Sequence, residues 1–376
     1  MTMTSASTLA APQSMALDPN SRESVMTTPP APEFPRVSIV VPCRNEAGFI
    51  AKCLDSILAN DYDGGKIEIL VVDGASDDST REIVGDYARS DPRIRLLDNP
   101  RRITPTALNI GIRASVGEVI IRMDAHNAYP VTYISSLVHW LVASGADNVG
   151  GIWITRPSGG SPMAEAIAVG LSHPFGVGNS YFRIGATEPR WVDNVPFGCY
   201  RRSVFERIGL FDEDLVRNQD DELNLRLIRK GGRILLVPSI QSHYHARGSL
   251  SKLAHMNFQY GYFKPLVIRK IGAVMTVRQV VPATFVAALA AGLLLSLIDP
   301  AGSILLVTLL GTYLTASIVA AAGSVRKHGI RTAAALIAVF PVIHIAYGTG
   351  FLRGVLDFFV RGLASPVDTT SIPITR

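Results

Sequence analysis

The chain has 376 residues, of which 48% are hydrophobic, and a net charge of +5. This length is ample for one large core and a further part. The modest charge, gathered beside apolar segments, favours anionic lipid headgroups over nucleic acid as a partner. The three cysteines, Cys43, Cys53 and Cys199, lack metal-ligand spacing and suit a reducing compartment rather than a disulfide-stabilised secreted protein.

Residues 1–34 are rich in Ser, Thr, Ala and Pro, and they contain one Arg and no apolar signal-peptide core. We expect a disordered tail there rather than a signal peptide. Residues 35–245 are then expected to form a catalytic domain that stays in the cytosol.

From Arg36 onward, short β-branched runs alternate with segments of helical spacing. Strands are predicted at Val37–Val41, Ile67–Val72, Ile94–Leu97 and Glu118–Met123, and helices at Gly48–Asn60, from near Asp78, and at Thr104–Ala114. This alternation predicts an α/β domain with a mixed, mostly parallel sheet covered by helices. Ligands of such sheets gather outside the carboxyl ends of the strands, so the residues that follow each strand are informative.

Polar residues follow three of these strands. They are the segment Pro42-Cys43-Arg44-Asn45-Glu46, the segment Asp73-Gly74-Ala75-Ser76-Asp77-Asp78, and the group Asp124-Ala125-His126. Acids after strands also cap the next helix, and this reading stays open for Asp77 and Asp78. No G-x-G-x-x-G follows the first strand, which counts against a dinucleotide-dependent oxidoreductase.

Asp124 and His126 are two residues apart, so their side chains point the same way in an extended segment. A carboxylate and a neutral imidazole can hold Mn²⁺ or Mg²⁺ and leave positions open for phosphate oxygens. The alternative is a surface loop in which His126 only forms hydrogen bonds.

A later helix is predicted within residues 217–232, because Leu223, Leu227 and Ile228 share one face. Its first turn then carries Asp220, Asp221 and Glu222. Acids are stabilised at that position by the helix dipole, so a purely structural role is an alternative to a catalytic one.

The C-terminal part is apolar. Residues 246–278 mix aromatic, basic and aliphatic side chains, which predicts helices in the headgroup zone with Tyr260, Tyr262 and Phe263 in an aromatic belt. Three uncharged runs of roughly 19 to 23 residues follow, at 280–298, 301–323 and 332–352. They predict about three transmembrane helices within 279–360 of a multi-pass protein of the cytoplasmic membrane, the alternative being a large buried helical core. The side on which the tail 361–376 lies is left open, because three spans would carry it outside whereas Arg353 and Arg361 favour the inside.

Four stretches together resemble family 2 glycosyltransferases of the GT-A fold, above all membrane-bound enzymes of succinoglycan-type exopolysaccharide assembly. They are VSIVVPCRNEAGFIAKCLDSI, ILVVDGASDDSTREIV, TPTALNIGI and IIRMDAHNAYP, and the likeness extends over about residues 36–265. The resemblance implies that Asp124 and His126 hold a divalent metal, Mn²⁺ or Mg²⁺. It further implies a nucleotide-sugar site made of Pro42, Arg44, Glu46, Asp73, Asp124, Arg247 and Gln259.

The run Gln219-Asp220-Asp221-Glu222-Leu223 with Arg226 resembles the family element E-D-x-D-L-x-x-R, and Asp220 falls on its catalytic base. The implied reaction is transfer of one sugar, with inversion, from a nucleoside-diphosphate sugar to a lipid-linked glycan acceptor at the membrane.

The sequence departs from the family pattern at Gly74, His126 and Gln219. These departures motivate an alternative, a catalytically inactive member that serves other polysaccharide-assembly proteins as a membrane partner. A nucleotidyltransferase is a third reading, but it needs a basic triphosphate-binding loop after the first strand, where Arg44 is the only cation.

One prediction concerns the metal. A neutral imidazole at His126, in place of a second carboxylate, is expected to weaken Mg²⁺ binding and shift the preference towards Mn²⁺. Titration of each metal against activity tests this, and stronger activation by Mg²⁺ would contradict it.

Overall fold

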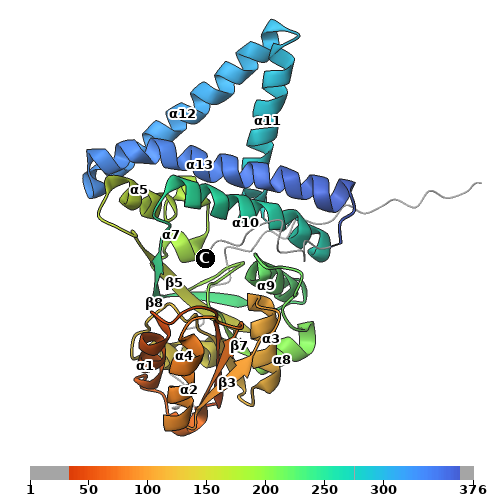
Figure 1. Cartoon of the computed structure of the whole chain (residues 1–376). Coiled ribbons are helices and arrows are strands. Elements are labelled where there is room, and N and C mark those ends of the chain that lie inside the picture. The colour runs from red at the N-terminus through yellow and green to blue at the C-terminus, as the bar shows by residue number, and fades with distance from the viewer. Residues whose placement is uncertain (1–33, 275, 365–376) are drawn as a thin grey trace, which may run out of the picture. The chain divides into compact units, whose positions relative to one another are not determined.

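The computed structural model describes residues 34–274 and 276–364 (Figure 1). The predicted disordered tail lies outside this part of the chain except for Phe34, and so do residues 365–376 of the C-terminal tail.

An eight-stranded sheet forms the centre of the α/β domain, in the order β3-β2-β1-β4-β7-β5-β8-β6. Its strands are β1 (Val37–Cys43), β2 (Ile67–Asp73), β3 (Ile94–Asp98), β4 (Val119–Arg122), β5 (Asn148–Arg156), β6 (Arg190–Trp191), β7 (Cys199–Arg201) and β8 (Ile234–His245). The pairs β1–β2, β1–β4, β2–β3 and β5–β8 are parallel, whereas β7 runs antiparallel to both β4 and β5, and β6 to β8. The predicted mixed, mostly parallel sheet is confirmed, and the four predicted strands lie within two residues of their observed bounds.

Helices cover both faces of this sheet. Within the α/β domain they are α1 (Ile50–Leu58), α2 (Thr80–Ser90), α3 (Thr104–Ala114), α4 (Tyr133–Ser144), α5 (Pro162–Gly170), α6 (Pro174–Val177), α7 (Tyr181–Ile184), α8 (Arg202–Ile208) and α9 (Gln219–Arg229), with a 3-10 turn at Gly64–Lys66. The remaining helices are α10 (Leu250–Ile271), α11 (Val281–Ser296), α12 (Pro300–His328) and α13 (Ile330–Val355), with a 3-10 turn at Val277–Gln279 and a π-helical turn at Leu356–Val360.

The alternation of side chains along β1 explains why the sheet has two covered faces. Ile39 and Val41 pack into one apolar core with residues of α1, α2 and α4. Val40, between them, packs into a second core with residues of α3, α8 and α9. Because both faces are covered, the strand ends are the exposed edge where polar side chains can gather.

Helix α10, which was expected in the headgroup zone, is buried along much of its length. It packs along α13 (Figure 1), and α13 also contacts α5. Tyr262 and Phe263 are only 4% and 2% exposed, and Tyr262 donates a hydrogen bond to Asp357 Oδ2 at 3.1 Å. The predicted aromatic belt is therefore wrong at these residues, because Leu225 of α9 and Phe358 of the π-helical turn pack where lipid was expected.

Two C-terminal helices are long and apolar enough to cross a membrane: Pro300–His328 and Ile330–Val360. The first of the three expected spans forms α11, which has 16 residues. At 1.5 Å per residue it reaches about 24 Å, less than the ~30 Å of a hydrocarbon core. Many large apolar side chains of α11 and α12 are exposed, such as Leu294 at 65% and Val307 at 69%, whereas α13 buries Leu336 and Phe340 completely.

The α10–α13 contact generates a stability prediction. A Cβ on Gly261 would lie 2.0 Å from the carbonyl oxygen of Tyr347, and one on Gly350 would lie 2.1 Å from that of Phe258. Backbone cannot yield as a flexible side chain does, so Gly261→Ala is expected to cost about 1–3 kcal/mol of stability. Thermal unfolding of the purified protein in detergent measures this. Gly311→Ala on α12, where a Cβ meets nothing within 4 Å, is the control, and equal melting temperatures for both variants would contradict the packing.

Candidate active site

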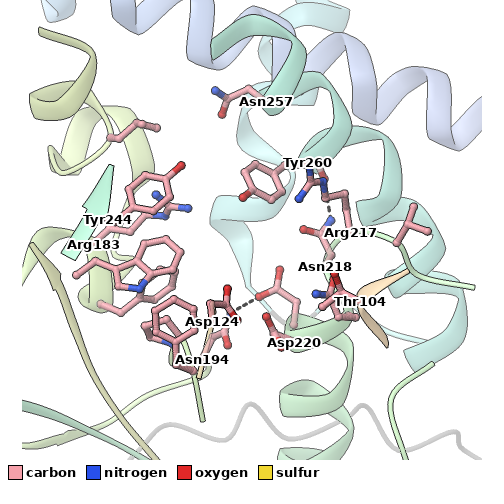
Figure 2. A pocket seen from close by; sticks show the side chains of 18 of the residues that line it. Thr104, Asp124, Arg183, Asn194, Arg217, Asn218, Asp220, Tyr244, Asn257 and Tyr260 are labelled. Atoms are coloured by element: carbon pink, nitrogen blue, oxygen red, sulfur yellow. Dashed lines mark hydrogen bonds between the residues drawn. The ribbon is translucent and has the colours of Figure 1, made fainter. Parts of the chain in front are cut away.

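A cavity of about 1030 Å³ lies between the carboxyl ends of β1 and β4, the start of α9, and the helices α10 and α13. Seven of the nine predicted site residues line it: Pro42, Arg44, Glu46, Asp124, His126, Asp220 and Arg247. Segments more than two hundred residues apart in the chain, such as Pro42 and Arg247, thus meet around one space. Figure 2 shows Asp124, Asn194 and Asp220 together at one side of it.

One guanidinium joins the carboxylates of the predicted metal ligand Asp124 and the predicted base Asp220. Arg122, at the end of β4, donates from Nε to Asp124 Oδ1 at 2.9 Å, and from Nη1 to Asp220 Oδ1 and Oδ2 at 2.6 and 2.7 Å. Burial alone lowers the pKa of Arg122, but the two carboxylates raise it above its ordinary value, so the guanidinium stays charged. The bridge fixes the distance between the predicted metal ligand and the predicted base.

The three acids at the start of α9 have different partners. Asp221 pairs with Lys264 and accepts a hydrogen bond from Asn194, whereas Glu222 pairs with Arg226 one turn later. Asp220 is the acid that contacts Arg122. Burial raises the pKa of Asp220 and Arg122 lowers it, an environment in which a carboxylate can be both ionised and basic.

The predicted metal ligands fit a divalent ion only with help from a substrate. Asp124 and His126 both line the cavity, but no group of three His, Cys, Asp or Glu converges as a ready-made metal site in the described residues. Mg²⁺ and similar ions are commonly held by one or two protein groups together with substrate phosphates, so this pair is sufficient when a diphosphate is present. Arg122 also donates from Nη2 to Asp124 Oδ2 at 3.3 Å, so a bound ion would compete with it.

His126 has a second partner in the cavity. Its Nδ1 lies 3.6 Å from Glu46 Oε1, and the interaction with Glu46 raises the pKa of His126. An imidazole must be neutral to bind a metal. Glu46 therefore makes metal binding through His126 weaker as the pH falls.

Two of the predicted binding residues lie behind the cavity wall. Asp73 is fully buried, accepts a hydrogen bond from the backbone N–H of Ser76 at 3.1 Å, and pairs with Arg81 at 2.7 Å. Gln259 is 1% exposed and accepts a hydrogen bond from Arg217 Nε at 3.3 Å. The structure does not bring either side chain into the lining; Gly74 and Arg217 stand there instead.

Sequence reasoning missed Arg122, although a signal was present. It lies two residues before Asp124 and therefore on the same side of an extended segment. It also missed the backbone conformation of the cavity wall. Of the five described non-glycine residues with positive φ, four line the cavity: Asn45, Arg102, Phe197 and Asn218, with φ between 48° and 62°. Strained backbone of this kind concentrates at functional sites.

Comparison with known proteins shows the family of the chain. The profile of the family "Glycosyl transferase family 2" matches residues 38–209. The succinoglycan biosynthesis protein ExoA of Rhizobium meliloti (strain 1021) is 32% identical over 323 residues, which cover 85% of this chain and 95% of that protein. The chain belongs to glycosyltransferase family 2. It is a glycosyltransferase, as the sequence motifs predicted.

More distant relatives are consistent with the assignment. A dolichyl N-acetyl-alpha-D-glucosaminyl phosphate 3-beta-D-2,3-diacetamido-2,3-dideoxy-beta-D-glucuronosyltransferase of Methanococcus voltae is 32% identical over 243 residues, 62% of this chain and 74% of that protein. Among solved structures, the mannosyltransferase PcManGT from Pyrobaculum calidifontis, in complex with GDP-Man and Mn²⁺, has a TM-score of 0.53 at 20% identity and covers 86% of this chain and 88% of its own. The GT-A fold is confirmed.

The Arg122 bridge predicts a change in pH dependence. Arg122 lowers the pKa of Asp220, so Arg122→Gln is expected to raise it, and the acid limb of the kcat/KM profile should move to higher pH. Donor consumption measured across the pH range tests this. Arg207→Gln is the control, because Arg207 pairs with Asp147 at 2.6 Å away from the cavity lining. An unchanged acid limb in Arg122→Gln would contradict the coupling.

Proposed function

We propose that this glycosyltransferase is inverting and metal-dependent, and that it moves one sugar from a nucleoside-diphosphate sugar to a lipid-linked glycan in exopolysaccharide or cell-envelope glycan synthesis. The observation that carries the proposal is the bridge of Arg122 between Asp124 and Asp220 inside one cavity. Two similar proteins support it, since one is a succinoglycan biosynthesis protein and the other is a mannosyltransferase in complex with GDP-Man and Mn²⁺.

In the proposed reaction Asp220 accepts the proton of the acceptor hydroxyl, a step typically worth ~10²–10⁴-fold in rate. The acceptor oxygen attacks the anomeric carbon from the side opposite the leaving nucleoside diphosphate, so the configuration inverts. Arg122 holds the carboxylate of Asp220 in place and keeps it from being neutralised. A divalent ion at Asp124 and His126 would supply Lewis-acid stabilisation of the leaving diphosphate.

The membrane position is also part of the proposal. We infer that α11 and α12 enter the bilayer as a hairpin while α13 stays against α10 and α5. Arg278 precedes α11, and Arg326 and Lys327 end α12, so both ends of the hairpin carry the positive charge typical of the cytoplasmic side. Arg353 and Arg361 then lie on the cytoplasmic side as well, in agreement with their positive charge. Three spans would instead carry the C-terminal tail to the outside.

The experiment that tests the function is a screen of radiolabelled sugar nucleotides with extracted membrane lipids and Mn²⁺. One donor is expected to label the lipid fraction. Asp220→Asn should reduce turnover by at least ~100-fold, because it removes the base, while donor affinity changes by no more than a few-fold.

Asp214→Asn is a matched control from the segment before α9, since Asp214 pairs with Lys270 and does not line the cavity. Near-normal turnover of Asp220→Asn would remove Asp220 as the base. Failure of every donor to label lipid would favour the inactive membrane partner.

A further inference from the structure

Besides Arg278, which pairs with Asp193, three arginines line the cavity away from its metal end. Arg183 lies on α7, Arg217 lies just before α9, and Arg247 follows β8. Figure 2 shows Arg183 with Tyr244 on one side of the space and Arg217 with Tyr260 on the other. All three guanidinium groups lie close enough to Tyr244 to lower its pKa, against the effect of burial, which raises it. They therefore form one cluster, here called the arginine cluster.

Arg183 is held in position by aromatic rings. Its Cζ lies 4.7 Å from the ring centre of Trp153 and 5.6 Å from that of Tyr244, and these two rings stack with centroids 4.6 Å apart. Stacking on ring faces fixes the plane of a guanidinium but leaves its edge free for hydrogen bonds. The Nη1 atom of Arg183 is buried and has no hydrogen-bond partner in the described structure.

Arg247 likewise has a buried donor without a hydrogen-bond partner among the described residues. This donor is Nε, and neither Arg183 nor Arg247 pairs with a carboxylate among residues 34–274 and 276–364. By contrast, two other cations of the lining, Lys264 and Arg278, pair with Asp221 and Asp193. Buried donors without partners are costly, so this end of the cavity is built to receive an anion.

The charge of the cluster supports the same conclusion. Burial lowers the pKa of Arg217, and the nearby Arg247 lowers it further. Like charges held together in a partly desolvated cavity repel, and a bound phosphate would relieve that repulsion while accepting hydrogen bonds from the planar guanidinium edges.

The residues around the arginine cluster indicate whether the bound phosphate belongs to the donor or to another molecule. The lining continues to Ile343 and Tyr347 of α13 and to Pro282 of α11, so the cavity reaches the apolar C-terminal helices. The diphosphate of the donor is expected at the other end, beside Asp124, His126 and Arg44. An anion at the arginine cluster thus has an apolar route on one side and Asp220 on the other.

We propose that Arg183, Arg217 and Arg247 form a subsite for the phosphate or diphosphate that links the acceptor sugar to its isoprenoid-type lipid. This inference rests on the proposed transfer to a lipid-linked acceptor and names how that acceptor is held. The acceptor sugar would lie between the arginine cluster and Asp220, where Asn257 and Tyr260 also face the cavity (Figure 2).

The test is direct binding to the full-length protein in nanodiscs, measured by calorimetry without metal, with farnesyl diphosphate, inorganic diphosphate and farnesol as probes. Farnesyl diphosphate is expected to bind more tightly than either of the others. The double variant Arg183→Gln/Arg247→Gln should weaken its binding roughly ten- to hundredfold, the loss expected for charge-assisted hydrogen bonds. Binding of the nucleoside diphosphate with Mn²⁺ should change less than about twofold, because the proposal gives Arg247, which the family resemblance placed in the nucleotide-sugar site, to the acceptor phosphate instead.

Arg233→Gln is the matched control. Arg233 also stacks on a tryptophan, with Cζ 4.6 Å from the ring centre of Trp191, but it does not line the cavity. The variants Arg183→Lys and Arg247→Lys keep the charge and guard against misfolding; partial recovery of farnesyl diphosphate binding is expected from them.

Three results would overturn the subsite. In the first, the double variant loses affinity for the nucleoside diphosphate as much as for farnesyl diphosphate. In the second, inorganic diphosphate binds as tightly as farnesyl diphosphate, and in the third, farnesyl diphosphate binds wild type and double variant equally well. The first assigns the arginines to the donor and the second to free phosphate. If no donor labels lipid but farnesyl diphosphate still binds through these arginines, the proposed function fails while the subsite stands.

Discussion

The architecture of this glycosyltransferase depends on one buried guanidinium placed between two carboxylates. Arg122 and Asp124 come from the end of β4, and Asp220 comes from the first turn of α9, 98 residues further along the chain than Arg122. Removing a single partner from such a buried group leaves an uncompensated charge, so the three residues are constrained together. The constraint fixes the end of the parallel part of the sheet against the helix that carries the proposed base.

The cavity extends from this bridge in two directions, and each direction has its own chemistry. Towards β1 and β2 its wall consists of strand-end backbone and polar side chains, among them Arg44, Glu46 and Gly74, an arrangement suited to a soluble nucleotide. Towards α10 and α13 it consists of arginines, stacked aromatic rings and apolar helix faces. Close glycine contacts bring α13 directly against α10, so the apolar helices form part of the cavity wall and are more than an anchor.

Much of the catalytic domain could be predicted because its signals are local. Strands such as Ile67–Asp73 are rich in apolar residues and buried on both faces, and α3 has the bounds that its sequence pattern indicates. Convergence of Glu46 and Asp124 followed from the rule that strand ends share one edge, whereas the place of Asp220 in the site came from the family resemblance. Features that depend on tertiary partners were missed. Nothing in the spacing of Tyr262 and Phe263 shows that a helix, rather than lipid, covers them, and nothing near Asp73 shows that Arg81 and Ser76 enclose its carboxylate.

The most direct test of the account is the position of the metal and of Arg122 in a complex. Crystals grown with Mn²⁺ and the nucleoside diphosphate, measured at the manganese absorption edge, would locate the ion from its anomalous signal. The account predicts an anomalous peak in contact with Asp124 and a diphosphate oxygen, with Arg122 still bound to Asp220. An ion bound away from Asp124, or an Arg122 that has left Asp220, would contradict it.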